Sequence, residues 1–594
     1  MRRMNCAWRA VLVVAVAGLG ACSPEGPAPS ELDGDRLYEE ARKAATSRPV
    51  LQEFVPLQVG PSVNDGLVQP WIAKRAELDP DWSTRVGVHD YDARLTRFDD
   101  ASWDARVLLA RQTLAAARDW PGGLVGDGHG GTQLSSARAS ESADLSLFTN
   151  ALRADVHEYD RHDARTDTPS LPLGAIAAVN DLLIQDFAPQ SKRAMLAVLR
   201  LQQVPEVLDD ARAHLGHPPR LWTEMAIAET DGAMAFLDGV PELAGPTPGL
   251  ADAIGMARAA LTDYRGFLER EVLPRSDGSF AVGRAEFEWR LHNVYLLDLD
   301  ADELLAIGQE QFEKTLAMLE ETARTIDPSR DWQALLAEMQ EQHPTSAELL
   351  DTYRGEVARA RQFLIDHDIV GIPEEQLQIR ETPAFLRTTL PFAAYDAPAP
   401  LDPSRLGTFY VTPDPEAHIL ADIPNTVWHE AYPGHHLQLV YAKDNPSVVR
   451  RLNDSPLLSE GWGFYCEELA SEAGYYDDPR ERLMQLNWRL QRAARVILDV
   501  SIHVFSMGYE PAVDFLVRRV GLARGAAEAS VNAYTRRPAY FSSYLLGMLE
   551  IVRLREECRS RLGARFSLRE FHERLLRCGN VPPALVEQAL VDWN

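Results

Sequence analysis

The segment 428–438, WHEAYPGHHLQ, contains the residue types of a zinc site in an unusual order. His429 and Glu430 open it like the zinc sequence H-E-x-x-H, in which two histidines on one helix face bind the metal and the glutamate acts as general base. A Pro-Gly pair begins where the second histidine should stand, and His435 and His436 follow it. The chemistry therefore depends on whether either late histidine can reach His429.

A regular helix would bring neither histidine to the right place. Histidines four residues apart lie about 40° apart around the axis and can share one ion. His435 would lie about 240° around the axis and roughly 9 Å along it from His429, and His436 about 10 Å along it. Pro433 cannot donate to the His429 carbonyl, however, and Gly434 can adopt backbone angles closed to other residues. We therefore expect a bulge of two extra residues that brings His435 to the second ligand position.

A third ligand is expected from the segment 457–470, LLSEGWGFYCEELA. Ser459 stands in a capping position, Glu460 follows it, and Glu467 lies two turns on along the same helix face. Two histidines and one glutamate, with water in the fourth position, form the pattern of a catalytic zinc site. Glu430 is then the general base. The alternative is a set of hydrogen-bonded polar residues around a buried helix kink, and the complete set of residues favours zinc over it.

Most of the chain has the apolar spacing of helices that could hold such a site. Asp300, followed by Glu303, has the pattern of an N-cap with an acidic first turn. Apolar residues recur at intervals of three and four in the segments 105–120, 193–215, 251–272 and 301–326.

The amino-acid composition changes directly before the motif. Segment 371–413 is rich in Pro, Thr and aromatic residues, and its short runs 377–382 and 407–412 predict strands of a small sheet. Helical spacing returns after Pro424. The sequence thus predicts a mostly α protein, a large helical body with a small β-sheet before the zinc-site helix.

The first residues have the features of a targeting segment. Two arginines precede the apolar run 11–20, which is too short to span a bilayer and is typical of a signal peptide. Leu19 to Cys22 resembles the lipobox of bacterial lipoproteins, in which the cysteine is lipidated; the alternative is a plain cleaved signal. We expect a signal peptide over 1–21, a lipidated Cys22 with a tether to residue 35, and a helical zinc-peptidase-like domain over 36–594. Ser23 after the cysteine resembles the outer-membrane sorting pattern.

Composition limits the partners. With 60 basic and 88 acidic residues the formal net charge is −28, which argues against nucleic acid or an anionic membrane surface as a partner. Membrane contact is expected only through the lipid on Cys22.

Cys466, Cys558 and Cys578 match no metal or redox motif. A Cys558–Cys578 disulfide and buried free thiols both remain possible, and the oligomeric state is open.

The chain resembles a large bacterial family known as domain of unknown function 885. Its members share H-E-A-Y-P-G-H-H-L-Q and a following S-E-G-W, here His429–Gln438 and Ser459–Trp462. The likeness extends over nearly all of residues 70–594 and includes the stretches 85–95, 282–308 and 381–398. That family is similar to the gluzincin metallopeptidases, whose G-H pair aligns with Gly434-His435. This resemblance implies His429, His435 and Glu460 as ligands of one Zn²⁺, with His436 as a neighbour.

One departure concerns the segment 538–547, PAYFSSYLLG, where family members usually read P-G-Q-A-x-S-Y-x-x-G. This run also resembles a tyrosine-bearing helix of angiotensin-converting-enzyme-like peptidases, in which a hydroxyl steadies the tetrahedral intermediate. Tyr540 and Tyr544 lie four residues apart, as on one helix face. Either tyrosine, or neither, could act.

The expected function is a zinc metallopeptidase that hydrolyses small peptides or oligopeptides in the cell envelope, with Glu430 as general base. Two alternatives remain open: a non-catalytic peptide-binding or scaffold lipoprotein, and a zinc hydrolase of another amide such as a cell-wall cross-link. An intact Glu430 argues against the scaffold. The sequence does not distinguish exopeptidase from endopeptidase action.

Overall fold

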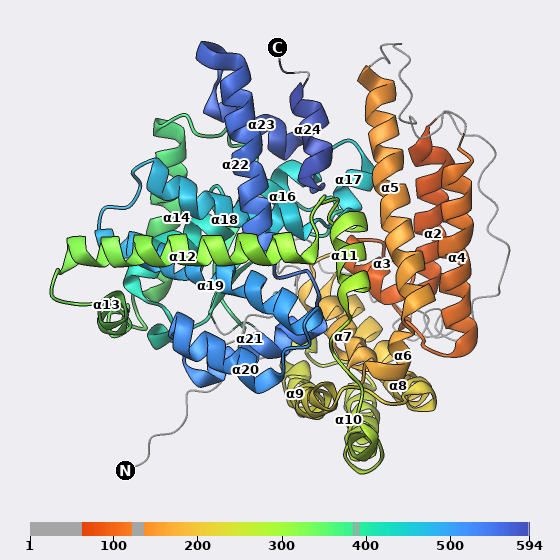
Figure 1. Cartoon of the computed structure of the whole chain (residues 1–594). Helices are drawn as coiled ribbons and strands as arrows, with labels where there is room; N and C mark the ends of the chain where they lie inside the picture. The colour runs from red at the N-terminus through yellow and green to blue at the C-terminus, as the bar shows by residue number, and fades with distance from the viewer. Residues whose placement is uncertain are drawn as a thin grey trace, which may run out of the picture.

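The computed structural model describes residues 62–120, 136–383, 387, 390, 392–591 and 593. The signal, lipidation and tether expectations for residues 1–35 lie outside these residues. Figure 1 shows α2, α4 and α5 side by side on one flank of the helical body. The helices up to the middle of the chain are α2 (Gln69–Leu78), α3 (Pro80–Val86), α4 (Asp100–Arg118), α5 (Ser136–Arg161), α6 (Ala164–Asp167), α7 (Gly174–Ile184), α8 (Gln190–His214), α9 (Arg220–Ala244), α10 (Leu250–Phe267) and α11 (Arg284–Asn293).

The second half of the chain holds the site and its supports. Its helices are α12 (Ala301–Ile326), α13 (Trp332–Met339), α14 (Leu349–Asp366), α15 (Ile423–Glu430), α16 (His435–Lys443), α17 (Val448–Leu452), α18 (Pro456–Glu472), α19 (Pro479–His503), α20 (Tyr509–Phe515), α21 (Arg524–Arg536), α22 (Ser543–Leu562), α23 (Leu568–Arg577) and α24 (Pro583–Val591). The mostly α class is confirmed. No helix within the described ranges combines the length and apolarity needed to span a bilayer.

The helices predicted from apolar spacing are present, with ends that differ by a few residues. Asp300 caps α12 through the Glu303 amide, and the Glu303 side chain accepts from the Asp300 amide, so this capping prediction is confirmed. Helix α10 ends before the predicted boundary and continues as a π-turn over Leu268–Val272. Apolar periodicity continues through such a turn, which is why the sequence pattern did not reveal it.

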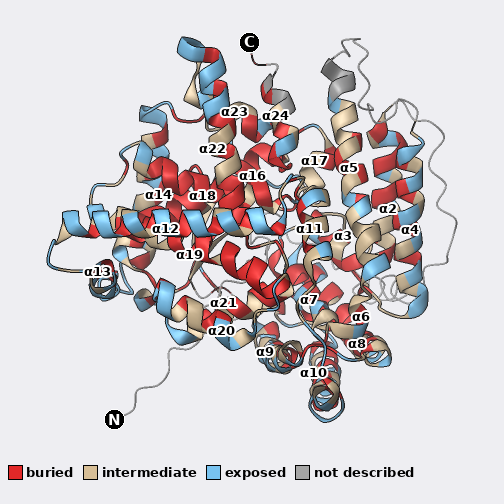
Figure 2. Cartoon of the chain, in the orientation of Figure 1, coloured by how far each residue is buried: buried red, intermediate tan, exposed pale blue. Residues whose placement is uncertain are grey.

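Burial in Figure 2 separates central helices from covering ones. Helix α18 packs along α22, and α12 packs along α19 with one apolar face inward and the other exposed. The main core runs through these helices, and a second apolar cluster joins α7, α8, α9 and α10. The site helix α18 is therefore held in the centre of the main core.

The predicted small sheet has three strands in the order β1-β3-β2. Strand β1 (Gln376–Glu381) pairs in parallel with β3 (Leu406–Val411), and β2 (Ala393–Asp396) pairs antiparallel with β3. The two predicted strands are confirmed. The sequence did not predict the edge strand β2, because its four residues are too few for an alternating pattern.

Cys466, Cys558 and Cys578 are buried free thiols. Of the two possibilities left open by the sequence, the structure has the thiols and not a Cys558–Cys578 disulfide. Burial raises the pKa of each thiol, so these cysteines behave as small apolar core residues.

Candidate metal centre

The candidate site is built on a break between α15 and α16. The chain leaves α15 through a cis peptide bond before Pro433 and then starts a new helix at His435. A Cβ atom on Gly434 would lie 1.8 Å from the His429 carbonyl oxygen, so glycine is required by this close approach. The expected bulge within one continuous helix is wrong in form, because Pro433 ends the first helix. Its expected consequence holds, since the His429 and His435 ring centroids lie 4.7 Å apart.

Glu460 of α18 joins the two histidines. Its Oε2 atom lies 3.9 Å from Nε2 of His429 and 3.6 Å from Nε2 of His435. One ligand atom each from His429, Glu430 and His435 also lies within 4.8 Å of the other two. Ligands at 2.0–2.1 Å from a tetrahedral ion are about 3.4 Å apart. The two distances from Glu460 exceed this spacing by at most about 0.5 Å, and two histidines with a glutamate are donors that zinc accepts, so the residues present fit a zinc ion.

The other nitrogen of the His429 ring is fixed by Glu467 and Arg492, which lie behind it. Nδ1 lies 2.7 Å from Glu467 Oε1, and Arg492 of α19 donates to both oxygens of Glu467 at 2.6 and 3.2 Å. A carboxylate on Nδ1 selects the tautomer whose Nε2 is free to bind a metal. Burial, with the charge of His435, lowers the pKa of His429 to about 3, so this imidazole is neutral. Burial would also lower the pKa of His435, but the hydrogen bond and charge of Glu460 outweigh it and raise that pKa, so a bound metal would have to displace its proton.

Helix α18 carries Glu460, and its N-cap and one of its glycines fix where the helix lies. Ser455 is its N-cap, and Ser459 lies inside the helix with its hydroxyl on the Ser455 carbonyl, so the expected capping role of Ser459 is wrong. A Cβ atom on Gly463 would lie 2.7 Å from the His429 ring. Burial would raise the pKa of Glu460, but the hydrogen bond and charge of His435 outweigh it and hold that pKa at about 2.

Glu430 is oriented by the sheet. Its Oε2 accepts a hydrogen bond from the Tyr395 backbone amide of β2 at 3.0 Å. One carboxylate oxygen is thereby anchored on the edge strand, and the other remains available to accept a proton next to the cluster. The unpredicted strand β2 thus positions the expected general base.

His436 faces away from the cluster. Its side chain is fully buried, and Nε2 lies 3.1 Å from Glu375, which also accepts a hydrogen bond from the Tyr432 hydroxyl at 2.6 Å. His436 is therefore a buried neighbour of the cluster that Glu375 holds in place. The Glu375 carboxylate ties together Tyr432, which precedes the Pro-Gly pair, and His436, which lies two residues after it. No spacing in the sequence links Glu375 to them.

Tyr540 and Tyr544 both reach Glu460. The Tyr540 hydroxyl donates to Glu460 Oε1 at 3.1 Å, and the Tyr544 hydroxyl interacts with the same carboxylate. They do not share a helix face, because α22 begins at Ser543 and Tyr540 lies in the turn before it. Burial and the charge of Glu460 raise the pKa of both phenols, so each hydroxyl keeps its proton and can donate it in a hydrogen bond.

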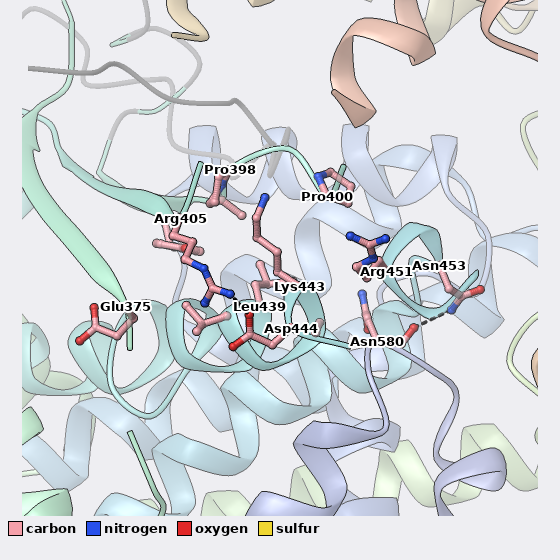
Figure 3. Close-up of a pocket in the computed structure, with 14 residues that line it drawn as sticks. Glu375, Pro398, Pro400, Arg405, Leu439, Lys443, Asp444, Arg451, Asn453 and Asn580 are labelled. Carbon is pink, nitrogen blue, oxygen red and sulfur yellow. Dashed lines mark hydrogen bonds and ion pairs between the residues drawn. The ribbon is translucent and has the colours of Figure 1, made fainter. Parts of the chain in front are cut away.

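Two cavities are lined by residues that support these groups. The larger, about 440 Å³, is lined by Tyr540 and Tyr544 and by Phe392, the residue directly before β2. The smaller, about 100 Å³, lies over the end of α16 between Glu375 and Arg451, where Figure 3 shows the Lys443 side chain reaching toward the 398–400 loop. The Lys443 ammonium donates to the Ala399 carbonyl at 2.5 Å. The larger cavity is lined by the two tyrosines that contact Glu460, a candidate metal ligand.

The sequence model of a bacterial protein family of unknown function, DUF885, matches residues 80–590. The chain belongs to this family. Among curated proteins, none matches the sequence significantly. A "putative lipoprotein of unknown function" from Shewanella oneidensis is similar in structure, with a TM-score of 0.73 and 23% identity over 89% of this chain and 99% of the other. A "putative lipoprotein" from Colwellia psychrerythraea has a TM-score of 0.74 and 19% identity over the same shares. At these identities the similarity establishes the fold.

Several supporting residues were missed from the sequence. The Tyr395 amide carries no side-chain signal, and Glu375 lies more than fifty residues before the histidine that it contacts. Arg492 and Arg495 both lie on α19, three residues apart and so on one face of the helix. Two arginines on a face that is otherwise apolar are unusual in a protein core, and this pattern could have been recognised in the sequence.

Proposed function

We propose that this protein is a zinc-dependent metallopeptidase. The convergence of His429, His435 and Glu460, with Glu430 alongside, is the observation that carries the proposal. Zinc at such a centre would supply a Lewis acid that polarises the scissile carbonyl and makes an attacking water more acidic.

The chain's own residues account for the remaining steps. Glu430, held by the Tyr395 amide, accepts the proton of the attacking water and returns it to the leaving amine. Tyr540 and Tyr544 offer neutral hydroxyls beside the cluster, where charge develops on the carbonyl oxygen. Glu467 and Arg492 keep the His429 ring in its binding tautomer.

The test is metal analysis of the purified protein followed by digestion of a peptide library. We expect about one zinc ion per chain, hydrolysis of short peptides, loss of hydrolysis on removing the metal with a chelator, and recovery on adding zinc. A protein that holds zinc and binds peptides but cleaves none would instead be a scaffold. One that cleaves only cell-wall cross-links would be a hydrolase of another amide.

We further propose that the protein is a lipoprotein of the cell envelope, anchored through Cys22. The lipobox-like residues Leu19–Cys22 support this, as do the two similar structures, each described as a "putative lipoprotein". The expected result is that the wild type partitions with membranes and that Cys22→Ser releases it or leaves it as an uncleaved precursor. A wild-type protein found wholly in the cytosol would contradict this proposal. Separation of the inner and outer membranes then tests whether the protein is in the outer membrane.

A further inference from the structure

Two arginines that line the larger cavity, Arg495 and Arg537, form no ion pair with any acidic residue in the part of the chain that the structure describes. The charged residues that line this cavity are Asp422, Arg495, Arg536 and Arg537. Arg536 pairs with Glu229 at 2.5 Å. The Asp422 carboxylate accepts hydrogen bonds from the Trp488 indole at 2.9 and 3.0 Å and from the Asn425 amide at 3.5 Å. Burial raises the pKa of Asp422 to about 7, which weakens its negative charge near neutral pH. The cavity therefore has a positive balance in a protein whose net charge is −28.

Arg495 is the inner of the two unneutralised arginines. It projects from α19 one turn after Arg492, and its guanidinium lies 5.0 Å from the centre of the Tyr544 ring. Its Nε atom is buried and has no hydrogen-bond partner. Within the described part of the chain, no ion pair joins it to a carboxylate. Tyr534 shares a hydrogen bond with it, and Glu460 and Glu467 act on it through charge alone. A largely buried cation without a counter-ion is costly unless a ligand supplies one.

Arg537 marks the outer rim of the same cavity. Its side chain is exposed and lies 5.0 Å from the centre of the Tyr540 ring, and no acidic residue among those described pairs with it. The two arginines thus flank the two tyrosines that contact Glu460. An anionic group drawn in at the rim would meet Arg495 within reach of the metal centre.

The rest of the lining is mainly apolar and aromatic, and includes Trp332, Leu336, Phe392, Met484 and Phe541. The volume of about 440 Å³ lies within the range of about 300–1,000 Å³ that is usual for small-ligand pockets. Such a cavity suits the terminal residue of a peptide, which has one charged group and an apolar side chain. It suits an internal segment of a long peptide less well.

We propose that this cavity binds the C-terminal end of the substrate, with Arg495 pairing with the free α-carboxylate and the apolar walls receiving the C-terminal side chain. The inference rests on the proposed peptidase function and specifies it as an exopeptidase that acts from the C-terminus. Arginine suits this task because its planar guanidinium can bind both oxygens of a carboxylate.

The experiment compares one peptide series with an apolar last residue in two forms, the free acid and the C-terminal amide. For the wild type we expect kcat/KM to be at least about 30-fold higher for the acid, the effect of removing one partner of a buried charge pair. Arg495→Gln should raise KM for the acid by a similar factor and leave the amide within about threefold. Arg495→Lys should restore part of the preference. Arg518→Gln is the control, since Arg518 is exposed and pairs with Asp514.

A binding measurement separates recognition from turnover. In the Glu430→Gln background, titration with the acid and the amide should give the same ratio of dissociation constants as the kinetics. Equal kcat/KM for acid and amide in the wild type would overturn the inference and leave the peptidase intact. An Arg495→Gln variant whose kcat falls equally for both forms would also overturn it, because the arginine would then act on the reacting carbonyl. Hydrolysis of neither form, nor of any library peptide, would overturn the proposed function and the inference with it.

Discussion

Replacing Glu430 with glutamine is expected to lower kcat by about 10² to 10⁴, the usual effect of losing a general base. Glutamine keeps the size of the side chain and its oxygen can still accept the Tyr395 amide hydrogen bond, which is 3.0 Å long. The replacement removes only the capacity to take up a proton. Zinc content, thermal unfolding and peptide binding should therefore remain close to those of the wild type.

The measurement is steady-state hydrolysis of a peptide identified by the library digest, together with zinc analysis of the same preparation. Glu557→Gln provides the matched control, because its side chain is about half exposed and pairs with Arg553 far from the cluster. A Glu430→Gln variant as fast as the wild type would mean that another group is the base. If instead its zinc is lost, Glu430 is a ligand, as its place within 4.8 Å of both histidines would permit.

The second large effect is expected on metal binding. His435→Ala and Glu460→Ala should each lose stoichiometric zinc, because each removes one of three protein ligands. His436→Ala should retain it, since Nε2 of the His436 ring is bound to Glu375 at 3.1 Å. Zinc per chain after dialysis, read alongside circular dichroism to establish folding, checks all three variants. Loss of zinc from His436→Ala with retention in His435→Ala would reverse the ligand assignment.

Glu467→Gln tests the support behind the cluster. The His429 Nδ1 atom would keep a hydrogen-bond partner but lose the carboxylate, which lies 2.7 Å away. Zinc affinity should fall by about 10- to 100-fold, as is typical when the partner of a histidine ligand is replaced. An unchanged affinity would show that the ring is held by packing against Gly463 and not by Glu467.

The sequence by itself determined the residues that can bind a metal and most of the helices that carry them. Local rules were sufficient for these features: apolar spacing for α8 and α12, Asp300 with Glu303 for the cap, and short β-prone runs for β1 and β3. The Pro-Gly interruption also had a local meaning, because a proline four residues after His429 cannot continue the helix. The sequence therefore indicated that His435, and not a residue in regular helical register, would lie beside His429.

Only the tertiary structure decided how these residues are supported. The Tyr395 amide that holds Glu430, the Glu375 carboxylate that holds His436, and the arginines of α19 come from segments far apart in the chain. Their contacts depend on packing between elements, for which residue spacing carries no signal. The first residues of α18 and α22 also could not be predicted, because helix ends shift by a few residues under tertiary contacts. Ser459 therefore lies inside its helix, and Tyr540 lies before the helix that carries Tyr544. Burial, finally, is a property of the whole fold, and it is burial that makes Arg495 a cation in need of a partner.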